Sequence, residues 1–216
     1  MKVKWLGHAS FLITSDSGTK VITDPYAPAP GRLDYADINE SADIVTCSHE
    51  HGDHNNASAV KGSPEVVKGS GTKEAKGVQF KGIASYHDDT QGSQRGPNTI
   101  FCFALDGIRV CHLGDLGHRL SAEQIKEIGE VDVLLSPMAG FYTIDAAVAK
   151  ETIDKIKPRV VIPMHFKNDK CLYPIAPVDD FLKGRTNVKK LDSSEVEFKK
   201  EQLPTATETV VLQHAL

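Results

Sequence analysis

The segment Ser48–His54 (SHEHGDH) concentrates side chains that could bind metal ions. Three histidines and one aspartate fall within six residues, directly after an apolar run expected to be a strand. Imidazole and carboxylate groups are ordinary protein ligands of zinc, iron and manganese. The alternation allows His49 and His51 to face one ion while Asp53 and His54 face a second. A solvated loop without metal is the alternative, but the chain holds only nine histidines, so this spacing favours a metal site.

Two metal ions need further ligands, and three candidates lie elsewhere in the chain. His87, Asp115 and His165 each stand just past the end of an apolar segment with the character of a strand. The histidine-rich segment has the same placement, so we expect all four loops to meet at one edge of the sheets. His112 competes with His87 as a ligand, but its position inside a strand pattern favours a role in the core or in supporting a ligand.

Short strands in the first half of the chain, and mixed strands and helices in the second half, must position these side chains. Asp106-Gly107 predicts a hairpin turn, because its backbone needs positive φ, and Ser121 with Gln124 forms a helix-capping pattern. No repeat or linker divides the chain, so residues 1–216 are predicted to form one layered α/β (α+β) domain. The expected strands are 3–6, 10–14, 20–23, 42–47, 78–86, 99–105, 108–113, 131–135, 160–162, 188–191, 196–199 and 209–212, and the expected helices are 57–61, 121–128, 143–157 and 178–183.

The bulk composition is that of an ordinary globular protein. Hydrophobic residues make up 40% of the chain and charged residues 25%, and the net charge is −4. A nucleic-acid-binding protein would normally show a basic footprint, so no nucleic-acid partner is expected. The four cysteines form no C-x-x-C pair and three lie in apolar runs, which favours reduced thiols. The apolar run near the N-terminus is too short for a signal peptide and no segment could span a membrane, so a cytoplasmic location is predicted.

Five motifs together resemble the metallo-β-lactamase-fold superfamily. His49, His51, Asp53 and His54 match its H-x-H-x-D-H signature completely. Four further motifs resemble the branch that includes sugar-phosphate lactonases and the N-acylphosphatidylethanolamine phospholipase; they are WLGHA at 5–9, DP at 24–25, GD at 114–115 and PMH at 163–165. The resemblance covers nearly the whole chain, and it implies a four-layer αββα sandwich with the site at one edge.

The same resemblance implies a role for each ligand. His49, His51 and His87 would hold the first ion, Asp53, His54 and His165 the second, and Asp115 would bridge both. The flank of His87, HDDT at 87–90, departs from the His-Ser type expected in that branch.

Three aspartates and one histidine are candidates for supporting or catalytic roles. Asp53 would orient the nucleophile or take its proton, as the resemblance implies. His8, in a turn between two strands, is predicted to act as an acid or to contact the substrate, with a structural role as the alternative. Asp24 would fix the orientation of a ligand histidine. Asp145 would do the same or would cap a helix.

These features predict a binuclear metal-dependent hydrolase. With two divalent ions, two carboxylates and a bridging hydroxide, the inner site would have a net charge near +1. Metal binding lowers the pKa of water toward about 7. Such a site suits a small anionic or ester-like substrate: an ester, a lactone or a phosphodiester. Zn²⁺ is the expected metal, with Mn²⁺ or iron as alternatives. An iron-dependent redox protein of the same fold, a metal-dependent nuclease and a binding protein with an inactive site are the competing hypotheses. The sequence leaves the oligomeric state open.

Overall fold

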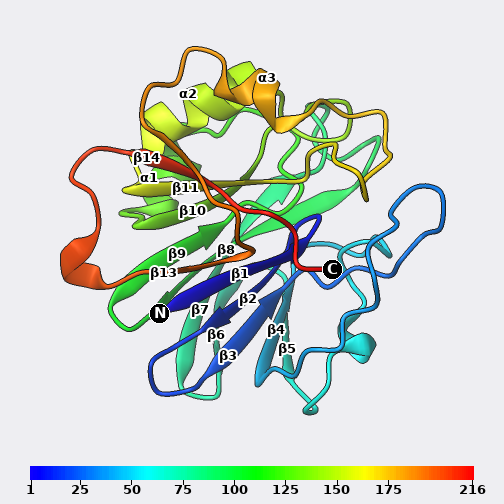
Figure 1. The fold of residues 1–216 in the computed structure, drawn as a ribbon, viewed down its shortest axis with the longest axis vertical. Helices are drawn as coiled ribbons and strands as arrows, with labels where there is room; N and C mark the ends of the chain where they lie inside the picture. The colour runs from blue at the N-terminus through cyan, green and yellow to red at the C-terminus, as the bar shows by residue number, and fades with distance from the viewer.

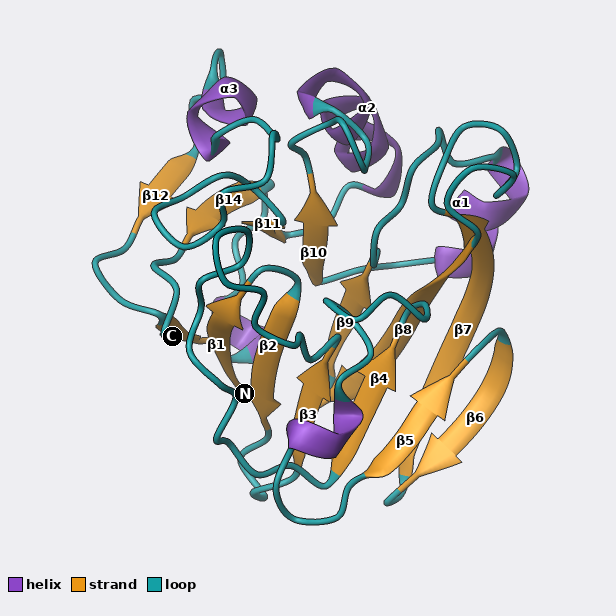
Figure 2. Ribbon diagram, turned by 90° about the vertical axis from the view of Figure 1, so that its right-hand side faces the viewer, coloured by secondary structure: helices purple, strands orange, loops and turns teal.

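The predicted strands form two β-sheets that pack face to face in the computed structural model, which describes residues 1–216 (Figures 1 and 2). The six-stranded sheet has the order β13 (Glu195–Glu197), β1 (Lys2–Gly7), β2 (Ser10–Thr14), β3 (Lys20–Thr23), β4 (Ile44–Cys47) and β5 (Glu65–Lys68). The eight-stranded sheet has the order β12 (Val188–Lys190), β14 (Glu208–Val211), β11 (Val160–Met164), β10 (Val133–Pro137), β9 (Ile108–His112), β8 (Pro97–Leu105), β7 (Val78–Tyr86) and β6 (Gly71–Ala75).

Strand direction divides each sheet into an antiparallel and a parallel part. In the six-stranded sheet, β13, β1, β2 and β3 pair antiparallel, whereas β3, β4 and β5 run parallel. In the eight-stranded sheet, β6 to β9 form an antiparallel meander, and the Asp106-Gly107 turn joins β8 to β9 as predicted. The remaining strands of that sheet run parallel to β9. The parallel strands β10 and β11 are fully buried, which explains their continuous apolar sequences.

Three α-helices connect the parallel strands and pack together on the outer side of the eight-stranded sheet (Figure 1). They are α1 (Ala122–Ile128), α2 (Ala146–Ile156) and α3 (Val178–Leu182), and short 3₁₀ turns occupy Ala57–Ala59 and Lys200–Gln202. The Ser121–Gln124 capping box is present. Helix α2 begins three residues later than predicted, because the Asp145 side chain caps it by accepting a hydrogen bond from the Val148 amide. None of these helices is both long enough and apolar enough to cross a membrane.

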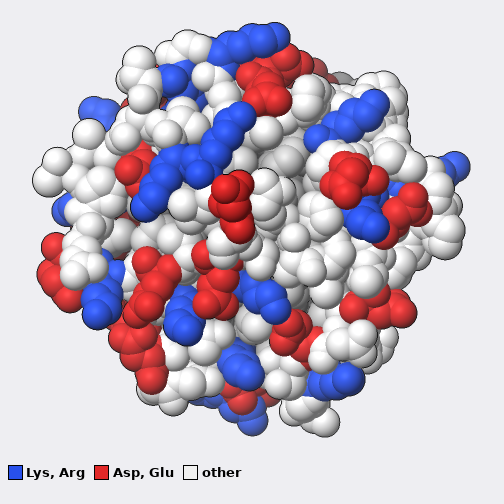
Figure 3. Space-filling view, in the orientation of Figure 1, with Lys and Arg blue, Asp and Glu red and all other residues white.

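The two sheets share one hydrophobic core of 57 buried residues, so they are joined by a continuous apolar layer and not by a thin contact. On the face shown in Figure 3, basic and acidic side chains are interspersed. Strands β1, β3, β4, β7, β9 and β11 are the ones that matter for the site, because a histidine or aspartate of the cluster described next stands within three residues of the end of each. The layered α/β fold predicted from the sequence is confirmed.

Candidate metal centre

Asp115 lies at the centre of the histidine cluster. Its Oδ2 atom is 3.2 Å from Nε2 of His54, 3.3 Å from Nε2 of His87 and 3.2 Å from Nε2 of His165. These residues follow strands from both sheets, and the side chain of Asp115 is almost completely buried. One carboxylate therefore faces three imidazoles.

The six other predicted ligands gather around Asp115 in two groups. On one side, the ligand atoms of His49, His51 and His87 all lie within 4.8 Å of one another, and Nε2 of His49 is 3.1 Å from Nδ1 of His51. On the other side, His54 and His165 form a similar group with His8. Asp53 borders this second group, with its Oδ2 atom 4.0 Å from Nε2 of His54.

His8 belongs to this cluster rather than to a distant turn. Its ring is fully buried, and the ring centroid is 4.2 Å from that of His165 and 4.9 Å from that of His54. Its Nε2 atom is 3.3 Å from Oδ2 of Asp53. The backbone of His8 has φ of 52°, a conformation rare for a residue with a side chain. The Trp5 indole and the His165 amide both donate hydrogen bonds to the His8 carbonyl and hold this turn in place.

Asp24 orients two histidines of the cluster from behind. Its Oδ2 atom lies 3.0 Å from Nδ1 of His54 and also accepts a hydrogen bond from the Ser48 hydroxyl. Because that hydroxyl donates its only proton to Asp24, it must accept one from Nδ1 of His49, 2.9 Å away. Nδ1 of His49 is then protonated and its Nε2 keeps a lone pair, and the bond to Asp24 likewise places a proton on Nδ1 of His54. Asp24 also falls in a group with His49 and His54 that could itself hold an ion, but its oxygens already accept these hydrogen bonds.

Replacing Asp24 by asparagine is expected to weaken metal binding about 10- to 100-fold, because an asparagine has only one acceptor oxygen, whereas Asp24 accepts from the Ser48 amide at Oδ1 and from the Ser48 hydroxyl and Nδ1 of His54 at Oδ2. Competition with a fluorescent chelator would measure the dissociation constant. Asp145→Asn is the matched control, since asparagine caps a helix as well as aspartate and Asp145 lies outside the cluster. Equal affinity in wild type and Asp24→Asn would contradict the orienting role.

Several buried polar atoms of the cluster lack the hydrogen-bond partners that a metal ion would replace. Buried polar atoms normally have hydrogen-bond partners, yet Nε2 of His54 and Oδ1 of Asp115 have none. Nδ1 of His165 and Nδ1 of His87 are also buried without a partner. Unpaired buried polar atoms are costly, and Nε2 of His54 and Oδ1 of Asp115 belong to side chains that face each other, where a cation would satisfy both. The residues present therefore fit one or two divalent ions.

Electrostatics separates the histidines into neutral and charged members. Burial, aided by the charge of His54, lowers the pKa of His49 to about 3, and burial with the nearby His165 lowers the pKa of His8 to about 4. Burial also disfavours the charged form of His54, but Asp115 and Asp53 outweigh it and raise the pKa of His54 well above its ordinary value. Burial raises the pKa of Asp115, whereas His165 and His54 hold that pKa well below its usual range. The neutral imidazoles at positions 8 and 49 are in the protonation state that metal ligation requires.

A buried asparagine fixes the loop that carries Asp115. Oδ1 of Asn98 accepts a hydrogen bond from the Asp115 amide at 3.0 Å, and Nδ2 donates to the Leu113 carbonyl and the Ser85 hydroxyl. Between them, Gly114 has φ of 56° and packs against Asn98 and Ser48. The sequence motif Gly114-Asp115 thus has a conformational reason, because the chain must turn sharply where no side chain fits.

His112, the competing ligand candidate, lies outside both groups. Its Nε2 atom hydrogen bonds to the Ala9 carbonyl at 2.9 Å, and its Nδ1 atom accepts from the Gly114 amide at 3.1 Å. With both ring nitrogens engaged by the backbone, His112 links β9 to the loop after β1. His87 instead turns its Nε2 atom toward Asp115. The other open candidate, Asp145, is exposed and caps α2.

A cavity of about 250 Å³ opens onto the cluster. Asp53, Asp115, His51, His87 and His165 line its floor, and four residues that the sequence did not single out as site residues line its walls: Arg32, Arg95, Tyr142 and Tyr173. The Tyr173 hydroxyl donates to Oδ2 of Asp53 at 3.4 Å, and the rings of Tyr142 and Tyr173 lie 5.6 Å apart. The sequence offers one signal for these residues, the Arg95-Gly96-Pro97-Asn98 loop, which is also compatible with a plain surface turn.

Comparisons with known proteins agree with this geometry. The model of the beta-lactamase superfamily domain matches residues 2–165. An Archaeoglobus fulgidus protein named UPF0173 metal-dependent hydrolase is 30% identical over 214 residues, an alignment that covers 85% of this chain and 90% of that protein. A solved Thermotoga maritima structure, assigned as a zinc-dependent hydrolase of the metallo-beta-lactamase superfamily, is 38% identical with a TM-score of 0.80, and the match covers 98% of this chain and 97% of that one.

The fold alone extends to proteins with different chemistry. CmlA from Streptomyces venezuelae, a diiron beta-hydroxylase, aligns with 99% of this chain and 52% of its own at 15% identity and a TM-score of 0.61. Function therefore has to be argued from the site and from the nearer relatives, not from the sandwich itself.

Proposed function

The chain belongs to the beta-lactamase superfamily and, within it, to the UPF0173 metal-dependent hydrolases, and from this membership we propose that it is a binuclear metal-dependent hydrolase of small esters, lactones or phosphodiesters. The observation that carries the proposal is the Asp115 carboxylate, which faces three imidazoles at 3.2 to 3.3 Å between two groups of histidines. The relatives are named metal-dependent hydrolases, and their names give no substrate.

The ligand assignment follows from the two groups. His49, His51 and His87 would hold the first ion, and Asp53, His54 and His165 the second, with Asp115 shared by both. The second group also contains His8, whose neutral ring lies beside Asp53. The short distances between these side chains and their unpaired buried atoms support this assignment. When bound, the ions would lower the pKa of a water molecule and polarise the bond to be cleaved.

Asp53 is the proposed proton acceptor. Its side chain is the partly exposed carboxylate on the cavity floor, where an attacking water would lie. Burial raises the pKa of Asp53, but His54 and His8 outweigh this and hold that pKa well below its usual range, so Asp53 is ionised at neutral pH. His8 on one side and Tyr173 on the other contact the same oxygen, Oδ2, and would hold it in place. His8 is thus a positioning group for Asp53 in this proposal.

Elemental analysis of the purified protein tests the proposal. About two zinc or manganese ions per chain are expected in the wild type, and chelation should remove both the metal and the hydrolysis of lactone and phosphodiester substrates. His51→Ala should lose metal, whereas His118→Ala, a histidine outside the cluster, should retain it. A wild-type protein that takes up no metal after reconstitution would contradict the proposal. Stoichiometric iron with oxygen consumption would replace it by redox chemistry.

Three further parts of the proposal have indirect support. The continuous core supports treating residues 1–216 as one domain. The four free cysteines agree with a cytoplasmic location. The branch with sugar-phosphate lactonases and the N-acylphosphatidylethanolamine phospholipase stays a prediction from the WLGHA, DP, GD and PMH motifs.

A further inference from the structure

Two arginines face the cavity without an acidic partner. Arg109, Arg119 and Arg159 each pair with a carboxylate elsewhere on the protein. Arg32 and Arg95 line the cavity above the metal-binding side chains, and neither forms an ion pair with any Asp or Glu. A guanidinium carries five N–H donors in a planar fork that matches carboxylate and phosphate groups. Free donors of this kind at a cavity mouth are available to a ligand.

Arg95 is held in position by a loop built around Asp88. The carboxylate of Asp88 accepts hydrogen bonds from the backbone amides of Thr90, Gly92, Gln94 and Arg95, at 2.9, 2.8, 3.0 and 2.7 Å. This buried aspartate explains why the flank of His87 differs from the expected pattern, since it organises the segment that follows. The guanidinium of Arg95 lies 5.7 Å from the ring centroid of Tyr142, within the range of a cation–π contact. Arg95 is therefore directed to the cavity before any ligand arrives.

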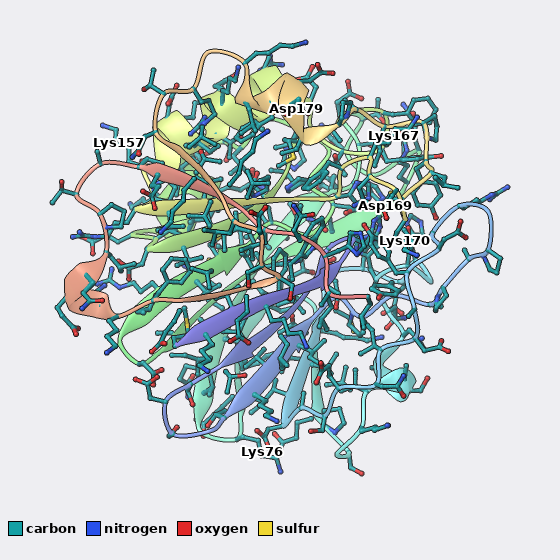
Figure 4. The ribbon with its side chains drawn as sticks, in the orientation of Figure 1. Lys76, Lys157, Lys167, Asp169, Lys170 and Asp179 are labelled. Atoms are coloured by element: carbon teal, nitrogen blue, oxygen red, sulfur yellow. The ribbon has the colours of Figure 1, made fainter.

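Arg32 is anchored through its backbone from the opposite side. Its carbonyl accepts a hydrogen bond from the Leu172 amide at 2.8 Å, and the Asp34 amide donates to the Lys170 carbonyl at 2.7 Å. These bonds join the loop after β3 to the loop after β11, which carries Lys167, Asp169 and Lys170 and lies beside it in Figure 4. The Arg32 side chain itself is exposed at the rim of the cavity. Two separate loops thus bring the two guanidinium groups to one cavity.

We propose that Arg32 and Arg95 form an anion-binding subsite that holds a carboxylate or phosphate group of the substrate away from the bond to be cleaved. The proposal rests on the proposed hydrolase function and narrows its substrate class. The cavity that both arginines line measures about 250 Å³, enough for a small substrate. The rings of Tyr142 and Tyr173 provide an apolar wall for the part of the substrate between the anionic group and the reacting bond.

Calorimetric titration with inorganic phosphate and with acetate tests this subsite, in both metal-free and metal-loaded protein. Phosphate or acetate should bind the metal-free wild type, and Arg32→Gln and Arg95→Gln should each weaken that binding at least about tenfold. The tighter of the two probes identifies the anionic group. Arg119→Gln removes the same charge outside this cavity and should bind like the wild type.

The outcomes separate this proposal from the hydrolase function. Anion binding that requires metal and is unchanged in both arginine variants would overturn the subsite and leave the hydrolase proposal standing. Anion binding that depends on the arginines in a protein that never takes up metal would support the subsite and overturn the hydrolase proposal. Absence of binding of either probe to metal-free and metal-loaded wild type alike would overturn the subsite.

Discussion

Asp115→Asn is expected to lower metal affinity by more than about 100-fold. This is a larger loss than expected for a residue such as Asp24, which hydrogen bonds to a ligand histidine. The substitution preserves the shape of the side chain and removes one negative charge from a buried position that faces three imidazoles. Two divalent cations could not then share that carboxylate, and their mutual repulsion would be less screened. Hydrolysis of lactone or phosphodiester substrates should fall with the metal content. Elemental analysis and chelator competition would measure both losses.

A second buried aspartate provides the control for general damage to the fold. Asp132 is 5% exposed, bonds to Lys200 and to the Arg109 amide, and lies outside both histidine groups. Asp132→Asn should therefore lower thermal stability and leave the metal content at its wild-type level. If Asp115→Asn retained two metal ions with wild-type affinity, Asp115 would not be the shared ligand and the assignment of both groups would need revision.

Gly114→Ala is expected to destabilise the protein by at least about 3 kcal/mol and to deplete the site of metal. A Cβ atom at this position would lie 2.6 Å from Cβ of Ser48 and closer still to Oδ1 of Asn98. Neither neighbour is free to move, because Ser48 bonds to Asp24 and Asn98 holds the Asp115 amide. The positive φ of 56° adds a backbone cost. Chemical denaturation of the metal-free variant would give the stability change.

Gly77→Ala separates the two causes of that destabilisation. Gly77 also has a positive φ, 77°, but a Cβ atom there would meet no other atom within 4 Å. We therefore expect a cost of about 1 kcal/mol from backbone strain alone, without loss of metal. Similar stability changes in the two variants would show that the close approach of Gly114 to Ser48 and Asn98 is unimportant.

The sequence predicted the strand framework well, because the apolar periodicity and turn residues were locally unambiguous. The segments Ser10–Thr14, Lys20–Thr23 and Val78–Tyr86 have the predicted bounds. The larger errors were at helix ends, such as the start of α2, where the cap residue decides the boundary and not the apolar spacing. The gathering of His87, Asp115 and His165 near the histidine-rich segment follows from one rule, that each stands within three residues of the end of a strand.

The walls of the cavity could not be predicted in the same way. Arg32 and Tyr173 belong to loops whose positions depend on hydrogen bonds between distant segments, such as that from the Leu172 amide to the Arg32 carbonyl. Loops of this kind have no periodicity to analyse. The separation of His87 from His112 also required tertiary information, because both follow or end apolar strands and only the backbone partners of His112 distinguish them.

The division of the cluster between the two sheets has a consequence for how the chain folds. The H-x-H-x-D-H loop and His8 belong to the six-stranded sheet, whereas His87, Asp115 and His165 follow strands of the eight-stranded sheet. Contacts between residues so far apart in sequence form late, because chain closure must precede them. A nascent chain with undocked sheets offers an incoming ion only part of the ligand set and holds it weakly. We therefore expect tight metal uptake only in molecules that have completed folding, so that metal content would distinguish finished from unfinished copies.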